Sequence, residues 1–228
     1  VGSEMCIRDS YDKAYTRAYT TEVVQGKHGV KITSHASVVA ETVQKILDVT
    51  ITWKIEAAGK IDADIAVTKD DEFPDLPRFG VRMFLDKKLS AVRYFGMGPQ
   101  ESYCDKHQAA SHGLYRADVG DLHEDYIRPQ ENGSHYDCEY VELNNSRYGI
   151  VASAEKAFSF NASYYTQEEL EKKTHNYELT ESDSVVFCVD YALNGIGSNS
   201  CGPVVLEQYR FDDVLFRFQF TLIPYVKG

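Results

Sequence analysis

Residues 42–68 read TVQKILDVTITWKIEAAGKIDADIAVT, and their pattern indicates the fold class. From Thr42 to Glu56, apolar and polar residues alternate almost without interruption. A period of two places one kind of residue on each face of a β-strand. An Ala-Ala-Gly tripeptide then turns the chain, and the alternation resumes from Lys60 to Thr68. The stretch therefore predicts a long antiparallel hairpin with one apolar face, on which Trp53 and Ile55 point inward.

The same alternation recurs in later segments that are separated by polar loops. One-sided alternation is typical of antiparallel sheets with one face on a core, and two such sheets pack face to face as a sandwich. One short helix is predicted after Thr166, whose hydroxyl accepts from the N–H of Glu169 while the Glu169 side chain returns to the N–H of Thr166. We therefore expect an all-β fold, an antiparallel two-layer β-sandwich with one short helix. The further predicted strands are 79–85, 89–96, 158–164, 185–191 and 216–222.

Composition narrows the class of protein. The 228 residues include 43% hydrophobic and 12% aromatic residues, which excludes a disordered chain. A net charge of −11 disfavours a nucleic-acid partner, and no apolar run reaches the roughly 18 residues that would cross a bilayer. The five cysteines are odd in number and show no CxxC spacing, which favours neither a disulfide framework nor a zinc site. Cysteines without such a pattern are typical of a protein in the reducing cytoplasm.

The first ten residues differ from the remainder. They have no strand or helix period and no apolar signal core, and they are typical of a non-native or junction segment. Residues 11–228 contain no linker-like tract. We therefore expect one domain over 11–228.

Residues 96–133 form a long irregular segment with few apolar runs, and loops of this length are uncommon unless they carry a function or are held by their own contacts. Glu101 and Glu131 each follow a Pro-Gln dipeptide, which favours a role in bracing a loop backbone over an acid/base pair. Four histidines also fall in or near this segment, without the spacing of a metal site, so no metal is expected in this chain. They are His107, His112, His123 and His135.

Several sequence motifs in a fixed order resemble one known family. They read LPRFG at 76–80, YFGMGPQESYCD at 94–105, YIRPQENG at 126–133, and FSFNASYY at 158–165 together with GIGSNSCGP at 195–203. From about Ser34 to Pro224, the chain resembles the C-terminal domain, also called the small chain or domain 5, of bacterial β-galactosidases of glycoside hydrolase family 2.

The resemblance implies a supersandwich of the galactose-mutarotase type in an enzyme that hydrolyses terminal β-D-galactose residues, for example of lactose. In that family two glutamates on a preceding TIM barrel perform a retaining hydrolysis, which needs two carboxyl groups about 5 Å apart. No catalytic residue is therefore expected in this chain, and the chain alone is predicted to be inactive. The family's opening segment has no match before Ser34, which implies an N-terminally truncated domain.

The resemblance also implies a substrate-pocket wall in the loop at 194–203, at Asn199 and Cys201. Family members often place a sugar-stacking Trp near the position of Cys201, and cysteine offers little ring-face area. The alternative, which the sequence leaves open, is that Cys201 is a small buried residue in a tight loop. The implied partners are the catalytic barrel and preceding domains, a β-galactoside, and further copies in a homo-oligomer. The resemblance implies Mg and Na or K for the full enzyme, and we expect a cytoplasmic protein.

Two other functions remain open at the level of sequence. A stand-alone carbohydrate-binding module would need exposed aromatic residues in a groove, for which Tyr164, Tyr165 and Tyr209 are candidates. A mutarotase-like sugar epimerase would need a Glu base and a His acid that face one cleft. Architecture alone does not decide between them.

Overall fold

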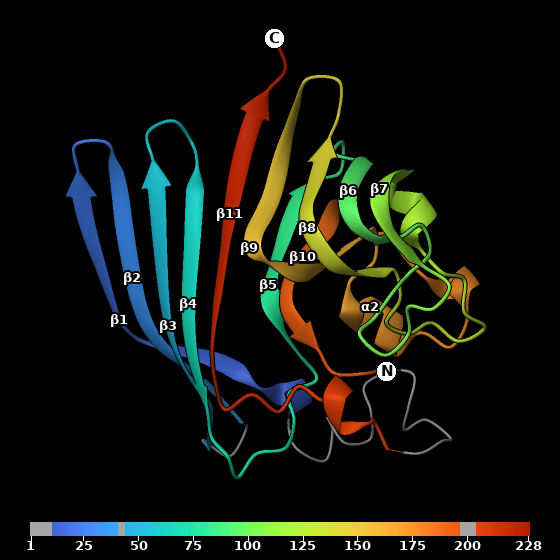
Figure 1. The fold of residues 1–228 in the computed structure, drawn as a ribbon, viewed down its shortest axis with the longest axis horizontal. Helices are drawn as coiled ribbons and strands as arrows, with labels where there is room; N and C mark the ends of the chain where they lie inside the picture. Colours follow the sequence, from blue (N-terminus) through green and yellow to red (C-terminus); the bar gives the residue numbers. More distant parts are fainter. Residues whose placement is uncertain (1–10, 41–43, 197–203) are drawn as a thin grey trace. The chain divides into compact units, whose positions relative to one another are not determined.

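A computed structural model describes residues 11–40, 44–196 and 204–228 (Figure 1). The chain divides into two compact units. The meander unit comprises the described residues up to Pro77 together with Asp212–Pro224, and the polar-core unit comprises Arg78–Phe211 with Tyr225–Gly228. Both units consist mainly of antiparallel strands, so the predicted all-β antiparallel class is confirmed.

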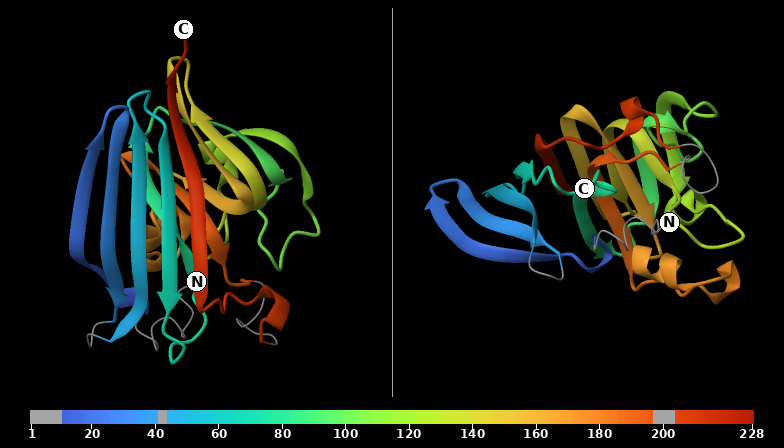
Figure 2. Two further views of the ribbon diagram at one scale, coloured as in Figure 1. Left: turned by 60° about the vertical axis from the view of Figure 1, so that its left-hand side comes forward. Right: turned by 90° about the horizontal axis from the view of Figure 1, so that it is seen from below.

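The meander unit begins with the short 3-10 helix η1 (Tyr11–Lys13) and contains five strands. Within it, each strand lies beside the next in the order β1-β2-β3-β4-β11, as the views in Figure 2 show. All four pairings are antiparallel. The strands are β1 (Tyr15–Gly26), β2 (Gly29–Val39), β3 (Lys45–Glu56), β4 (Ile61–Lys69) and β11 (Leu215–Val226).

The predicted hairpin corresponds to β3 and β4, which pair from Leu47↔Lys69 to Ile55↔Ile61. Gly59 turns the chain between them with a φ of +94°, a value that favours glycine. Trp53 lies on the apolar side, with its ring 6.1 Å from that of Phe220 in an edge-to-face contact. Ile55 lies on the same side but is 36% exposed, so its predicted inward position is only partly realised.

The polar side of the same strands carries hydrogen-bonded pairs between neighbouring strands. The Arg217 Nε donates to Asp64 Oδ1 at 2.6 Å, and the Thr221 hydroxyl donates to Asp62 Oδ1 at 2.6 Å. Cross-strand pairs of this kind stabilise a sheet on its solvent side. Both aspartates therefore lie outside the apolar core, as the alternation requires.

The polar-core unit contains six strands in the order β7-β6-β8-β9-β10-β5. Predicted strands lie in or overlap four strands of this unit, β5, β6, β9 and β10. The predicted strand 216–222 lies in β11 of the meander unit. Between them lie the 3-10 helices η2 (Val119–Leu122), η3 (Asn176–Glu178) and η4 (Glu207–Tyr209). The six strands are β5 (Arg78–Asp86), β6 (Ala91–Gly98), β7 (Ser111–Asp118), β8 (Ser134–Asn144), β9 (Tyr148–Ser163) and β10 (Ser184–Leu193).

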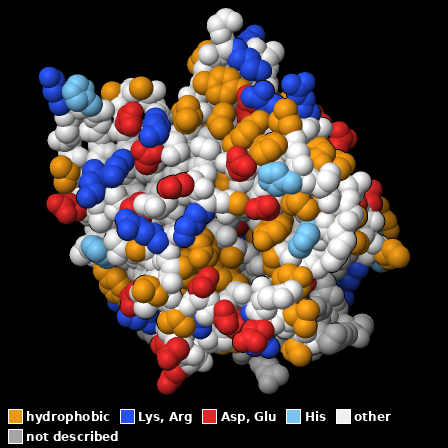
Figure 3. Space-filling view, in the orientation of Figure 1, with side chains coloured by type: hydrophobic (Ala, Val, Ile, Leu, Met, Phe, Trp, Pro, Cys, Tyr) orange, Lys and Arg blue, Asp and Glu red, His pale blue; other side chains and the backbone are white. Residues whose placement is uncertain are grey.

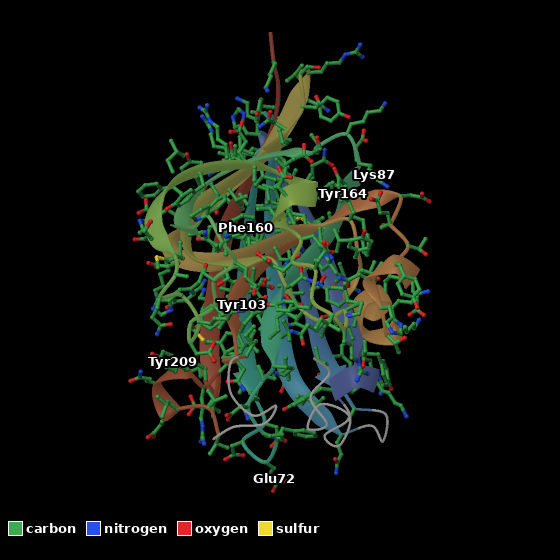
Figure 4. The ribbon with its side chains drawn as sticks, turned by 90° about the vertical axis from the view of Figure 1, so that its right-hand side faces the viewer. Glu72, Lys87, Tyr103, Phe160, Tyr164 and Tyr209 are labelled. Atoms are coloured by element: carbon green, nitrogen blue, oxygen red, sulfur yellow. The ribbon has the colours of Figure 1, made fainter. Side chains whose placement is uncertain are left out.

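The core of this unit mixes aromatic and polar side chains. Figure 4 shows Tyr103 and Phe160 among the interior side chains. The Tyr94 ring lies 5.0 Å from Phe160 and 4.5 Å from the imidazole of His135, which is fully buried. Burying polar groups costs free energy unless they are hydrogen-bonded. The stability of this unit therefore depends on the hydrogen-bond partners of its buried polar side chains.

The helix α2 (Gln167–Lys172) begins after Thr166, whose hydroxyl accepts from the N–H of Glu169 at 3.1 Å as predicted. The reciprocal half of the predicted capping box is wrong. The Glu169 carboxylate accepts instead from the N–H of Thr180 at 2.9 Å and so ties the helix to the segment before β10. No helix in the described ranges is both long and apolar enough for a membrane span.

Candidate functional site

The loop at 194–203 is the pocket wall that the family resemblance implies. Its two predicted pocket residues, Asn199 and Cys201, lie outside the described residues. Their assignment therefore stays a prediction.

The first residues of this loop are described, and distant segments hold them. The N–H of Gly195 donates to the carbonyl oxygen of Tyr209 at 3.1 Å, and the N–H of Ile196 donates to Asp105 Oδ1 at 3.1 Å. A Cβ on Gly195 would lie 2.7 Å from Asp105 Oδ2, so a side chain there would displace the aspartate. Asp105, in the family motif of 94–105, thus fixes the direction in which the loop leaves β10.

A buried ionic cluster lies on the neighbouring strands β5 and β10. Arg78 donates to both carboxylate oxygens of Asp190, from Nε at 2.8 Å and from Nη2 at 2.6 Å. Its Nη1 lies 3.4 Å from Glu131 Oε2. Gly80 pairs with Asp190 across the strands, and a Cβ there would lie 2.2 Å from Asp190 Oδ1. The missing side chain therefore leaves room for the carboxylate.

The two carboxyl groups of this cluster share one guanidinium. The Asp190 side chain is 2% exposed and that of Glu131 is 18% exposed. Burial raises the pKa of both carboxyl groups, and the charge of Arg78 opposes that rise. The sequence did not indicate this cluster because Arg78 and Asp190 are 112 residues apart.

Several polar atoms of the same unit are buried without a hydrogen-bond partner among the described residues. Two of them belong to groups that interact electrostatically, the hydroxyl of Tyr103, whose side chain Figure 4 labels, and Oε1 of Glu131. Burial raises the pKa of Tyr103 well above its ordinary value, and the negative charge of Glu131 adds to the shift. Tyr103 belongs to the interior of the unit and not to an exposed cleft, since it is only 2% exposed.

Glu101 is a buried carboxylate that three donors satisfy. The Lys106 Nζ donates to Glu101 Oε1 at 2.5 Å, the Tyr126 hydroxyl donates to the same oxygen, and the N–H of Gly133 donates to Oε2 at 2.9 Å. Burial raises the pKa of Glu101, but these hydrogen bonds outweigh burial, and the pKa lies below its ordinary value. Glu101 is therefore an ionised brace between the segments around 101–106 and 126–133.

The predicted bracing of a loop backbone is confirmed for Glu101, which accepts the N–H of Gly133. Glu131 acts differently. Glu131 faces the Arg78 guanidinium and braces its loop through an ion pair instead of a backbone hydrogen bond. Both glutamates are thus engaged by cations, which is how a fold holds a buried carboxylate.

Replacing Glu101 by glutamine is expected to lower the free energy of unfolding by about 1–2 kcal/mol, because charge-assisted hydrogen bonds from Lys106 and Tyr126 are weakened. Urea denaturation of the purified chain at pH 7 measures the change. Glu124→Gln is the matched control, since Glu124 is exposed in the same segment. Equal stability of the two variants would contradict the bracing role.

The four histidines of the segment around 96–135 are dispersed. The His107 Nδ1 lies 2.9 Å from the carbonyl oxygen of Tyr103, and the His112 Nε2 lies 3.1 Å from that of Asp137. The His123 ring packs against Tyr165, and His135 is in the core. Within the described ranges, no three or more His, Cys, Asp or Glu side chains are grouped for a metal ion.

The three tyrosines considered for sugar stacking have different surroundings. Figure 4 shows Lys87 close to Tyr164, and its Nζ lies 5.3 Å from the centre of that ring. Tyr165 contacts His123 with ring centres 4.9 Å apart. Tyr209 lies in η4, where its carbonyl oxygen holds Gly195. A sugar-binding platform needs free ring faces, and a cation or an imidazole already contacts two of these rings.

Comparison with known proteins identifies relatives over nearly the whole chain. A β-galactosidase of Actinobacillus pleuropneumoniae is 47% identical over 213 residues, which cover 93% of this chain and 21% of that protein. The β-galactosidase of Staphylococcus xylosus is 34% identical over 212 residues, with the same shares covered, and that of Kluyveromyces lactis is 31% identical over 211 residues. The chain thus spans about a fifth of the length of the curated relatives it matches.

Similarity to solved structures is distant. A GalM/aldose epimerase homologue from C. elegans shares 10% identity at a TM-score of 0.42, with 92% of this chain and 69% of that chain covered. A Pichia pastoris lysyl oxidase reaches a TM-score of 0.32. At these TM-scores, neither likeness indicates a function.

The family assignment therefore comes from sequence. The family model described as the β-galactosidase small chain matches residues 4–222. This range begins inside the first ten residues and before Ser34, where the resemblance of individual motifs begins. Because the match covers nearly the whole chain, this protein belongs to the β-galactosidase small-chain family.

Proposed function

We propose that this chain is the C-terminal part of a cytoplasmic β-galactosidase of glycoside hydrolase family 2 and that it completes the substrate pocket and the assembly of that enzyme. The observation that carries the proposal is the 47% identity to a β-galactosidase over 93% of the chain. The anchored base of the loop at 194–203 supports it, because Asp105 and Tyr209 fix the direction of a loop that would face the pocket.

The hydrolysis itself would occur outside this chain. A retaining glycosidase needs one carboxyl group as acid/base and a second as nucleophile, about 5 Å apart. Glu101 accepts three hydrogen bonds and Glu131 faces Arg78. Neither arrangement resembles a carboxyl group that is free to exchange a proton with a substrate. The reacting pair would therefore come from the four-fifths of the enzyme that precedes this part.

The remaining properties of the enzyme follow from the same proposal. Its substrates would be β-galactosides such as lactose, and the complete enzyme would be a homo-oligomer. It would use Mg and Na or K, bound by residues outside this chain. The described residues supply no group of three or more His, Cys, Asp or Glu side chains for a metal ion.

The purified chain alone is expected to hydrolyse no chromogenic galactoside, whereas joining it to the remaining four-fifths of the Actinobacillus relative should give a hydrolytic enzyme. The measurement is release of nitrophenol at a fixed protein concentration, with the truncated relative alone as the control. A truncated relative that is fully active by itself would contradict the role of this chain.

The variants Glu101→Gln and Glu131→Gln distinguish a local active site from a supporting one. Turnover by the isolated wild-type chain that is lost in either variant would overturn the proposal. The expected result is no turnover by any of the three isolated chains.

A further inference from the structure

The outer strand of the meander unit is unusually exposed. The burial of β1 (Tyr15–Gly26) is low along its whole length, and among the described residues it pairs with β2 alone. In an antiparallel pair, every second residue directs its backbone N–H and C=O away from the partner. The outer edge of β1 therefore offers a row of free hydrogen-bonding groups. Its large apolar side chains are also exposed, namely Tyr15 (49%), Tyr19 (55%), Val23 (62%) and Val24 (51%).

One side of the sheet next to this edge is apolar and incompletely covered. Along β3, Leu47 and Val49 are 4% and 7% exposed, the next two apolar residues are half-buried, and Ile55 is 36% exposed. On this side, residues of neighbouring strands lie opposite each other and form rows across the sheet. One such row consists of Val23, Ile32 and Trp53. The apolar flank is defined by Val23, Val30, Ile32, Trp53 and Ile55.

The opposite side of these strands is polar. Figure 3 shows Lys, Arg, Asp and Glu side chains gathered over the strands at the left of the view, where β1 to β4 lie. A segment that extends the sheet beyond β1 would therefore need apolar residues at alternate positions, directed to the apolar flank, and polar residues between them.

β1 also has few of the features that block strand addition. Edge strands are usually protected by lysines, prolines, β-bulges or a short length. β1 is 12 residues long, lacks proline, and has Arg17 and Glu22 as its only charged side chains, although a bulge interrupts its register near Tyr19. A strand of this kind is a template for a further strand.

We propose that the outer edge of β1 and the apolar flank bind one extended amphipathic strand from the part of the β-galactosidase that lies outside this chain. The inference rests on the proposed function, since it takes that enzyme as the source of the strand. The chain spans 21% of the Actinobacillus relative, so about four-fifths of such a polypeptide is available to supply the strand. A segment on the same polypeptide acts at a high effective concentration and outcompetes a second copy of this chain for the edge.

The test compares amide hydrogen exchange in the isolated chain and in the chimera that joins this chain to the remaining four-fifths of the Actinobacillus relative. The outward amides of β1 should exchange at least about tenfold more slowly in the chimera, because strand pairing protects them. The amides of β2, which lie between two strands, are the internal reference. Exchange does not depend on turnover, so it is measurable in an inactive chimera.

Two lysine variants of the chimera test the apolar flank. Val23→Lys places a charge on the flank, and Val24→Lys, its matched control, places the same charge on the polar side of the same strand. Val23→Lys should restore fast exchange to the outward amides of β1, and Val24→Lys should leave them protected. Unprotected outward amides in the wild-type chimera, or equal exchange in the two variants, would overturn the inference.

Two further outcomes keep the hypotheses separate. An active chimera with an unprotected edge would contradict this inference but not the proposed function, whereas a protected edge in an inactive chimera would support strand binding and count against the proposed function. Concentration-dependent dimerisation of the isolated chain in sedimentation experiments, lost in Val23→Lys, together with an unprotected edge in the chimera, would assign the edge to a second copy instead.

Discussion

Replacing Arg78 by methionine is expected to lower the free energy of unfolding by about 3–5 kcal/mol, because the change leaves a buried carboxylate without its counter-charge. Arg78 makes two hydrogen bonds to Asp190, whose side chain is 2% exposed, and faces Glu131 as well. Methionine retains much of the side-chain volume, so the loss reflects charge and hydrogen bonding more than a cavity. Urea denaturation of the purified chain at pH 7 measures it.

Arg82 provides the matched control on the same strand. Its Nη1 lies 2.8 Å from Glu168 Oε1, but the two side chains are 38% and 54% exposed. Exposed ion pairs contribute at most about 1 kcal/mol, so Arg82→Met should change the stability little. A second variant, Arg78→Met with Asp190→Asn, should recover part of the loss because it removes one of the two carboxylates that Arg78 faces. Similar stabilities of Arg78→Met and Arg82→Met would show that the buried cluster does not hold the unit together.

Acidification from pH 6.5 to pH 4 is expected to destabilise the chain through His135, by up to about 3 kcal/mol. Burial lowers the pKa of His135 from 6.5 to about 4. The unfolded chain therefore takes up a proton below about pH 6.5, whereas the folded chain does so only near pH 4. The stabilising contribution is complete above pH 6.5, falls as the pH drops through this window, and is constant below it.

The variant His135→Phe isolates this contribution. The imidazole stacks on Phe160 with ring centres 5.0 Å apart, and a phenyl ring occupies a similar volume, although the contact of Nδ1 with the carbonyl oxygen of Met97 is lost. Between pH 4 and 6.5, the stability of the variant should depend less steeply on pH than that of the wild type, as measured by denaturation at several pH values. The exposed His28 provides the control, and His28→Gln should keep the wild-type slope.

Three carboxyl groups with shifted pKa values also change the stability of the chain as the pH falls. The raised pKa values of Asp190 and Glu131 favour the folded state at lower pH and so oppose the effect of His135. The lowered pKa of Glu101 acts in the same direction as His135, but at lower pH. The difference between wild type and His135→Phe is therefore the decisive quantity, and identical slopes would contradict the prediction.

Some strands were not predicted, and the reason is physical. β7 lies inside the segment that the sequence presented as a long irregular loop, and β1, β2 and β8 were not predicted either. In β1 and β7 the side chains are exposed or only half-buried on each face, and Leu114 of β7 is 56% exposed. Without a buried face, selection for alternating apolar residues is absent, so the period-2 signal is weak. Such strands are defined by backbone pairing with their neighbours, which depends on the whole sheet.

The all-β class, the β3–β4 hairpin, the start of α2 and the family could be predicted from the amino-acid sequence. These follow from local alternation, one glycine turn, one capping hydroxyl and an ordered set of motifs, which neighbouring residues specify. By contrast, only the folded chain shows that Arg78 pairs with Asp190, that Glu101 accepts from the N–H of Gly133, and that Glu169 accepts from the N–H of Thr180. The first two contacts join residues 112 and 32 positions apart in the chain, and their contribution depends on burial, which weakens solvent screening and makes an unpaired charge costly. Local patterns specify neither the distance between such groups nor their burial, because both arise only when the strands have paired.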